Sequence, residues 1–169
     1  AVKALGLSKL LVIPDRIAPH KQLPEGSASP EQRLRMLELA LEGERKITVS
    51  DLELRREGPS YTYETVEQLH ARYPQDQLIL LMGTDMFLTF HQWRCPERIL
   101  AEASLGVFYR GDRDEKEQIA AHKMQMEAAG HKVYLVSNDV VEISSTNLRR
   151  MLIFRCAEPF LPEGVAGYI

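Results

Sequence analysis

This sequence of 169 residues has few or none of the features of disulfide-rich, membrane-spanning, secreted or nucleic-acid-binding proteins. It has only two cysteines, Cys95 and Cys156, whose isolation predicts free thiols and not a disulfide framework. It contains no apolar run long enough to span a bilayer and no signal-peptide pattern. Its net charge of −3 offers no general attraction for nucleic acid or anionic membranes. We therefore expect a cytoplasmic protein that binds neither nucleic acid nor membranes.

Short apolar runs that alternate with helical patterns occupy most of the chain. The runs expected to be strands are 9–13, 47–51, 77–83, 105–109 and 132–136. Between and after them lie expected helices at 30–41, 58–73, 85–103, 113–129 and 145–154, the third of them broken. This alternation predicts a single α/β domain over 1–169, with a Rossmann-like open parallel sheet and flanking helices. The most continuous run, 77–83, is expected to be the central strand.

Polar residues follow several of these strands. In open parallel sheets, ligands bind beyond the carboxyl ends of the strands. The residues expected there are Lys21 in Pro19-His20-Lys21, Gly83 and Asp85 in Gly83-Thr84-Asp85, Arg110, and the segment Ile143-Ser144-Ser145-Thr146. We therefore expect a lysine, a Gly-x-Asp, an arginine and a helix start at one edge of the sheet.

The segment ISSTNLR at 143–149 is typical of a strand that ends and a helix that begins. Ser144, Ser145 and Thr146 are good N-cap residues, and the first amides of a helix lack internal partners. Arg149 follows within about one turn of the helix, so hydroxyls, amides and a guanidinium are able to meet one anion, such as a phosphate. The alternative is an ordinary capped helix with exposed arginines.

Five segments together resemble one known family. They are PHK at 19–21, RREGPSYTYETVEQL at 55–69, MGTDMFLTFHQW at 82–93, ISSTNLR at 143–149 and LPEGVAGYI at 161–169. In this order they resemble the HxGH-type nucleotidyltransferases, most closely bacterial nicotinate-nucleotide adenylyltransferase. The ISSTxxR motif specifies only the superfamily, whereas GPSYTxxT followed by GxD and a tryptophan points to the nicotinate enzyme.

One motif of the family is missing from this sequence. The GGxFxPxHxGH pattern of the first strand and helix does not occur, and residues 1–8 resemble the end of that helix. The resemblance therefore implies an N-terminally truncated nucleotidyltransferase domain without its first βα unit.

The resemblance also implies a reaction. ATP and nicotinate mononucleotide would be the partners, Mg²⁺ would accompany ATP, and the products would be nicotinate adenine dinucleotide and pyrophosphate, as in NAD biosynthesis. No protein metal site is expected, and the oligomeric state is open, with a homo-oligomer among the alternatives. Two other functions remain open: an adenylyltransferase for nicotinamide mononucleotide or phosphopantetheine, and an inactive truncated nucleotide-binding module.

The roles of individual residues follow from the same resemblance. Lys21 would neutralise phosphate at the reacting centre, and Arg149 would hold the ATP phosphates. The ATP-binding residues would be Gly83, Asp85, Ile143, Ser144, Ser145, Thr146 and Arg149. The residues that bind nicotinate mononucleotide would be Tyr61 and Thr62 through backbone amides, Trp93 by stacking, and Arg110 at a phosphate.

Each of four residues has a structural alternative. Lys21 would be a solvated loop lysine and Asp85 a helix N-cap. Trp93 would pack in the core, and Arg110 would form a surface salt bridge.

Overall fold

The computed structural model describes residues 1–169 except 20–23, 25, 110–114, 138–142 and 155. The chain divides into two compact units. The first consists of Ser60–Val140 with Ala1 and Lys3–Leu5, and the second of Gly6–Pro59 and Val141–Ile169 with Val2. Each unit has its own parallel sheet.

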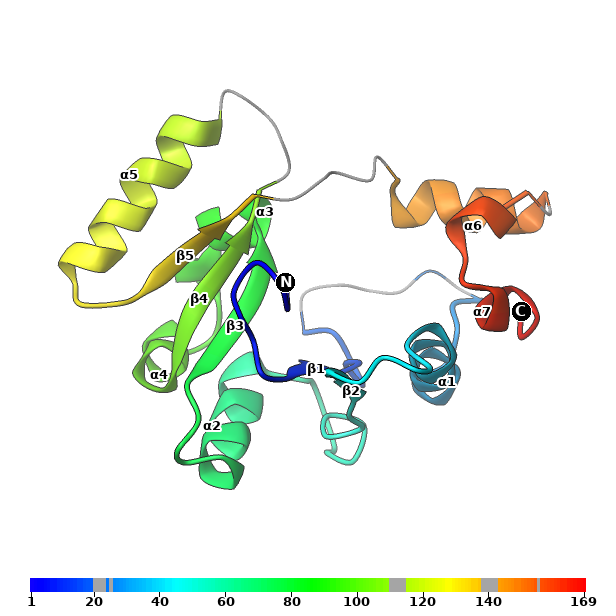
Figure 1. Cartoon of the computed structure of the whole chain (residues 1–169), viewed down its shortest axis with the longest axis horizontal. Coiled ribbons are helices and arrows are strands. Elements are labelled where there is room, and N and C mark those ends of the chain that lie inside the picture. Colours follow the sequence, from blue (N-terminus) through cyan, green and yellow to red (C-terminus); the bar gives the residue numbers. More distant parts are fainter. Residues whose placement is uncertain (20–23, 25, 110–114, 138–142, 155) are drawn as a thin grey trace. The chain divides into compact units, whose positions relative to one another are not determined.

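The first unit is built on three parallel strands in the order β3-β4-β5 (Figure 1). The strands are β3 (Leu78–Gly83), β4 (Ala103–Phe108) and β5 (Val133–Val136). The helices are α2 (Thr62–Arg72), α3 (Thr84–Leu88), the 3₁₀ helix η1 (Phe90–Gln92), α4 (Pro96–Glu102) and α5 (Glu115–Ala128). In the register of the sheet, Gly83 lies opposite Phe108 and Phe108 opposite Val136, so the three strands end at one edge.

The second unit has a two-stranded parallel sheet. Its strands are β1 (Leu10–Val12) and β2 (Ile47–Val49), with α1 (Pro30–Ala40) as the crossover between them. The C-terminal elements are α6 (Ser145–Ile153), the 3₁₀ helix η2 (Glu158–Phe160) and α7 (Glu163–Ala166). α7 packs against α1.

The predicted α/β architecture with parallel strands is confirmed, and each of the five predicted strands is present. The prediction that 77–83 is the central strand is wrong for the described sheet, because β4 lies between β3 and β5. A continuous apolar run shows that both faces of a strand are covered, but it does not show which strands pair with it. Leu105 and Val107 make β4 the more deeply buried strand, at 0% and 1% exposed.

Local chemistry explains the start of α1. The Ser29 hydroxyl accepts a hydrogen bond from the Gln32 amide at 3.2 Å, and the Gln32 side-chain oxygen accepts one from the Ser29 amide at 2.8 Å. Pro30 occupies the first helical position, where a missing N–H costs nothing. This is the capping box that the residues Ser29-Pro30-Glu31-Gln32 predict.

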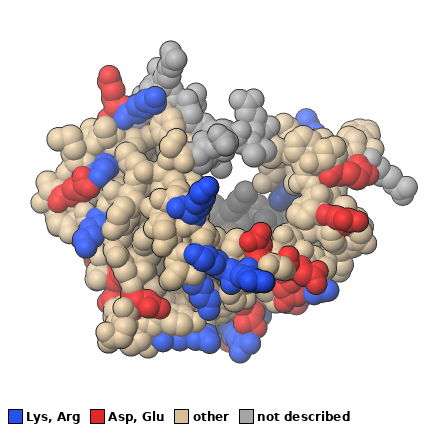
Figure 2. Space-filling model, viewed as in Figure 1, with Lys and Arg blue, Asp and Glu red and all other residues tan. Residues whose placement is uncertain are grey.

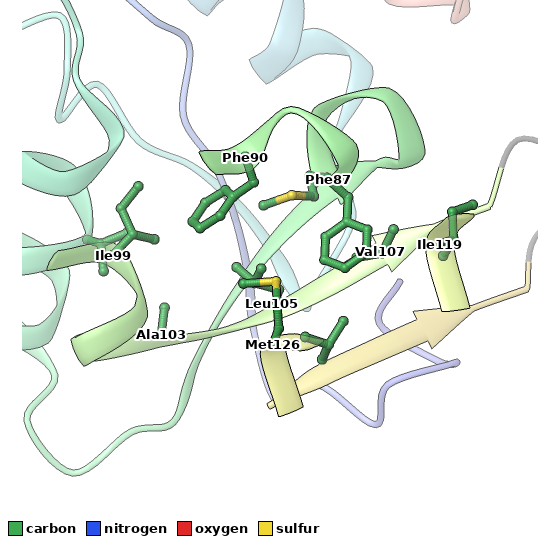
Figure 3. Packing of buried hydrophobic residues seen from close by; sticks show 11 residues of the cluster. Phe87, Phe90, Ile99, Ala103, Leu105, Val107, Ile119 and Met126 are labelled. Atoms are coloured by element: carbon green, nitrogen blue, oxygen red, sulfur yellow. The ribbon is translucent and has the colours of Figure 1, made fainter. Parts of the chain in front are cut away.

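A cluster of buried apolar side chains holds the helices of the first unit against β4. Figure 3 shows Phe87 and Phe90 pointing toward the strand that carries Leu105 and Val107. The Phe87 and Ile99 side chains are 0% exposed. Burial of each such side chain contributes about 1.5–3 kcal/mol, so this cluster holds α3 and α4 against the sheet.

Gly106 lies in β4 where packing leaves no room for a side chain. A Cβ atom at this position would lie 2.6 Å from Leu81 Cδ2, 3.1 Å from Ile79 Cγ2 and 3.3 Å from Leu5 Cδ1. We expect Gly106→Val to lower the free energy of unfolding by about 2–3 kcal/mol because three neighbours must move. Urea denaturation followed by circular dichroism measures this change. Gly106→Ala is the control and is expected to lose less, since its single methyl group meets the movable end of Leu81. An unchanged midpoint for the valine variant would contradict the close packing.

The surface carries both signs of charge. On the face in Figure 2, the coloured Lys and Arg side chains are interspersed with Asp and Glu side chains, in keeping with the net charge of −3. Among the helices formed by described residues, none is long and apolar enough to cross a membrane. That the protein does not bind nucleic acid stays a prediction.

Candidate functional site

The carboxyl edge of the sheet in the first unit gathers the N-terminal ends of several helices. α2 leads into β3 and α4 into β4, so each helix runs back across the sheet and begins near that edge, while α3 starts directly where β3 ends. The starts of α2 and α4 are neighbours, since the Cζ atom of Arg94 lies 4.9 Å from the ring centroid of Tyr61. Ligands of parallel α/β sheets bind at this edge.

The turn from β3 into α3 contains the predicted Gly83 and Asp85. Gly83 is the N-cap of α3 with φ −83° and ψ 167°, which is an extended conformation open to any residue. A glycine therefore matters here for its lack of a side chain and not for its backbone angles. Asp85 is exposed in the first turn of α3, so the alternative that it is the N-cap is wrong. A carboxylate in this place is stabilised by the helix dipole and is able to accept hydrogen bonds from hydroxyl groups.

Tyr61 and Thr62 lie at the start of α2. Tyr61 is the N-cap, and its own side chain makes no capping hydrogen bond. Helix geometry leaves the amides of Thr62 and Tyr63 without acceptors inside the helix. The structure thus places the predicted pair at a helix start with positive partial charge, which suits a carboxylate.

Two tyrosines and two arginines stack along the α2–α4 contact; we call Arg94, Tyr61, Tyr63 and Arg98 the Arg–Tyr stack. The two tyrosine rings lie 6.0 Å apart with an interplanar angle of 24°. Arg94 lies over Tyr61, and the Cζ atom of Arg98 lies 4.3 Å from the ring centroid of Tyr63. Arg98 is neutralised by Glu67 through two hydrogen bonds of 2.7 Å.

The hydroxyl of Tyr63 at this contact is polarised. It donates a hydrogen bond to the Glu64 carboxylate at 3.0 Å, which is the main reason why the pKa of Tyr63 is raised, with burial as a second reason. Arg94 opposes this rise in pKa, so its guanidinium interacts with Tyr63 as well as with Tyr61.

Trp93 directly precedes Arg94 of the Arg–Tyr stack. Its ring centroid is 5.3 Å from that of Phe90, and the side chain is half-buried against the core cluster. Core packing, the structural alternative for Trp93, therefore accounts for part of the ring. Part of the Trp93 ring is exposed, and its stacking on the nicotinate ring stays a prediction.

His122 of α5 packs on the core from another side. Its ring centroid lies 4.8 Å from that of Phe87 in an edge-to-face arrangement and 6.4 Å from that of His91. The pKa of His122 is lowered, first because of burial and second because of the charge on His91. This histidine therefore acts as a packing residue.

The start of α6 in the second unit bears out the sequence pattern. Ser144 is the N-cap, and its hydroxyl accepts a hydrogen bond from the Asn147 amide at 3.1 Å. Its hydroxyl is thus occupied, whereas helix geometry leaves the amides of Ser145 and Thr146 without intrahelical acceptors. Arg149 is exposed and lies four residues after Ser145, so both share one face of α6. Ile143 directly precedes the cap and is half-buried.

Two predicted residues, Lys21 and Arg110, lie outside the described residues. Of the other predicted residues, Tyr61, Thr62, Gly83, Asp85 and Trp93 belong to the first unit, and Ile143, Ser144, Ser145, Thr146 and Arg149 belong to the second. Within the described ranges, no group of three or more His, Cys, Asp or Glu side chains is arranged to hold a metal ion.

Sequence reasoning missed two features near the strand ends. Arg94 follows the predicted tryptophan, but its stacking on Tyr61 joins two segments that are distant in sequence. In the second unit, Arg33 of α1 pairs with the Asp15 carboxylate after β1 and donates to the Asp15 carbonyl at 2.7 Å. The only local signal for this pair was the polar Asp15 next to Pro14 at a strand end.

Parallel strands whose carboxyl edge carries a glycine, a carboxylate and helix N-termini are typical of nucleotide-binding α/β proteins. The sequence model of the cytidylyltransferase-like family matches residues 1–151, and the chain belongs to this family. The family membership that the motifs indicate is thereby confirmed.

Two bacterial relatives carry the same name, "probable nicotinate-nucleotide adenylyltransferase". The protein of Idiomarina loihiensis is 34% identical over 180 residues, which cover 99% of this chain and 85% of the relative. The protein of Pectobacterium atrosepticum is 35% identical over 183 residues, which cover 99% of this chain and 84% of the relative. The similarity thus extends over nearly the whole chain.

A solved structure shares the fold. The Plasmodium falciparum nicotinic acid mononucleotide adenylyltransferase complexed with NaAD superposes with a TM-score of 0.71 and 19% identity, covering 96% of this chain and 82% of that one. At this low identity the likeness shows the fold, and it confirms the Rossmann-like α/β prediction.

Proposed function

We propose that this protein transfers the adenylyl group of ATP to nicotinate mononucleotide, which yields nicotinate adenine dinucleotide and pyrophosphate for NAD biosynthesis. The observation that carries the proposal is the 34% identity, over 99% of the chain, to a relative named for this activity. The free cysteines Cys95 and Cys156 are in keeping with a cytoplasmic enzyme.

The reaction needs positioning and charge neutralisation more than a protein nucleophile. A phosphate oxygen of nicotinate mononucleotide attacks the α-phosphorus of ATP and forms a new P–O bond. The bond between the α-phosphorus and the bridging oxygen breaks, and its electron pair leaves with pyrophosphate. Cations and helix-end amides that align the two phosphates and stabilise the leaving group supply the catalysis.

The start of α6 is suited to the triphosphate. The amides of Ser145 and Thr146 and the guanidinium of Arg149 are donors for the β- and γ-phosphates. Ser144 holds the helix start in shape through its cap, and Ile143 leads into it. Lys21 is assigned to the phosphate at the reacting centre on the motif alone.

The first unit is suited to the nucleoside parts of both substrates. Gly83 and Asp85 are assigned to the adenosine, where the carboxylate accepts from ribose hydroxyls. The start of α2 at Tyr61 and Thr62 is assigned to the nicotinate carboxylate, and Trp93 to its ring. Arg110 is assigned to a substrate phosphate on the motif alone.

Mg²⁺ belongs to this proposal as a companion of ATP. The described residues provide no cluster of ligands for a resident metal ion, so protein side chains are not assigned to hold it. The ion would be bound by the phosphates of the incoming nucleotide.

Release of pyrophosphate from ATP with Mg²⁺ tests the proposal. Nicotinate mononucleotide, nicotinamide mononucleotide and phosphopantetheine are compared as acceptors. Two forms are assayed: the chain as it stands, and the same chain joined to an upstream strand–GGxFxPxHxGH–helix segment. We expect turnover with a preference for nicotinate mononucleotide. Turnover with phosphopantetheine alone would contradict the assigned acceptor, and a folded protein that binds ATP without turnover in either form would contradict the enzyme.

A further inference from the structure

Arg94, which lies over the N-cap residue of α2, has no carboxylate partner among the described residues. Within the Arg–Tyr stack, Arg98 is matched by Glu67, whereas Arg94 forms no ion pair among the residues that the structure describes. Its side chain is exposed and lies over the ring of Tyr61, the N-cap of α2. Among the described residues, the stack therefore holds one neutralised and one unneutralised guanidinium.

The surroundings of Arg94 hold it in place. The face of Tyr61 attracts the guanidinium, and Tyr61 is itself stacked on Tyr63. The next residue, Cys95, has φ 51° and ψ 55°, a left-handed conformation that is uncommon outside glycine. This sharp turn before Pro96 ends the segment that carries Arg94 and starts α4. A stacked guanidinium loses little further entropy when it binds a ligand.

Two features next to Arg94 suit an aromatic carboxylate, and a third, the carboxylate of Glu64, opposes one. The N-cap residue Tyr61 makes no side-chain capping hydrogen bond, and Trp93 directly precedes Arg94. Glu64 in the first turn of α2 carries a negative charge. A guanidinium beside this helix start attracts a carboxylate and offsets repulsion from Glu64. Of the two arginines in the stack, Arg98 pairs with Glu67, whereas Arg94 forms no ion pair among the described residues.

We infer that Arg94 is a specificity-determining residue that pairs with the nicotinate carboxylate and so favours the acid over the amide. The inference rests on the proposed function. A carboxylate gains a charge-assisted hydrogen bond from the guanidinium, while the neutral carboxamide of nicotinamide mononucleotide gains much less. Arg94 thereby adds side-chain charge to the backbone recognition assigned to Tyr61 and Thr62.

The test compares kcat and KM for the two mononucleotides in wild type, Arg94→Gln, Arg94→Lys and Arg98→Gln. Arg94→Gln is expected to raise KM for nicotinate mononucleotide about tenfold, the loss of one interaction with a charged group. Its kcat, and its constants for the amide, are expected to stay nearly unchanged. Arg94→Lys keeps the charge and is expected to retain most of the preference for the acid. Arg98→Gln, in the matched position of the stack, is expected to lower thermal stability without changing the ratio of acid to amide.

The outcomes separate this inference from the proposed function. If wild type prefers the acid and folded Arg94→Gln keeps the same ratio, the role of Arg94 is overturned while the function stands. If Arg98→Gln changes the ratio as much as Arg94→Gln, the effect comes from packing of the stack and the inference is again overturned. If neither the chain as it stands nor the chain joined to the upstream segment turns over either mononucleotide, the proposed function fails, and the role of Arg94 fails with it.

Discussion

Arg149→Ala is expected to lower kcat/KM for ATP by about 100- to 1,000-fold, the usual cost of removing one donor that stabilises developing charge. Arg149 shares a helix face with Ser145, whose amide has no intrahelical acceptor at the start of α6. The β- and γ-phosphates gain negative charge as pyrophosphate leaves, so the guanidinium interacts more strongly in the transition state than in the ground state. Steady-state kinetics with varied ATP, at fixed nicotinate mononucleotide, measure the effect.

Arg150→Ala is the matched control for this prediction. Arg150 is the adjacent residue of α6, is also exposed, and projects about 100° further around the helix. Its removal is expected to change kcat/KM by less than about fivefold, as for a solvated charge. Equal losses in the two variants, or a negligible loss in Arg149→Ala, would favour the alternative of an ordinary capped helix with exposed arginines.

Phe87→Ala is expected to destabilise the first unit by about 3–5 kcal/mol, because it leaves a cavity in a packed core. The Phe87 ring is 0% exposed and contacts the ring of His122 at 4.8 Å between centroids. It also anchors α3, whose first turn holds Asp85. Urea denaturation followed by tryptophan fluorescence measures the loss. Trp93 is the only tryptophan and packs on Phe90, so its signal reports this unit.

Two further variants make the stability result specific. Phe87→Leu keeps most of the volume and is expected to cost at most about 1.5 kcal/mol. Met86→Ala removes the neighbouring side chain, which is 49% exposed, and is expected to change stability by less than about 0.5 kcal/mol. If Phe87→Ala behaved like Met86→Ala, the ring would not be part of the core that positions α3.

Features governed by neighbouring residues were predictable from the sequence. The capping box of α1 and the N-cap Ser144 of α6 follow from side chains that bond to backbone groups three residues away. The strands follow from apolar runs of the right length. The predicted site residues at helix starts, Thr62 and Ser145, lie where the pattern put them.

Features governed by distant residues were not predictable in this way. The alternative that Asp85 caps α3 is wrong, because the N-cap is Gly83, two residues earlier, and Phe87 in this helix is buried in the core. The position of β4 between β3 and β5 is not predictable from each strand alone, because strand order depends on which crossovers form. Arg94 carried no local signal, since arginines are common on surfaces and its partner Tyr61 belongs to another helix.

The sequence by itself determined the order of strands and helices, the caps of α1 and α6, and the motifs of a nucleotidyltransferase. These depend on side-chain periodicity and on hydrogen bonds within one turn, which each segment carries along with it. Only the tertiary structure decided that β4 lies between β3 and β5, that Phe87 contacts His122, and that Arg94 stacks on Tyr61 while Arg98 pairs with Glu67. Such pairings arise because burial of apolar surface brings together segments that are distant in sequence, so no single segment predicts them.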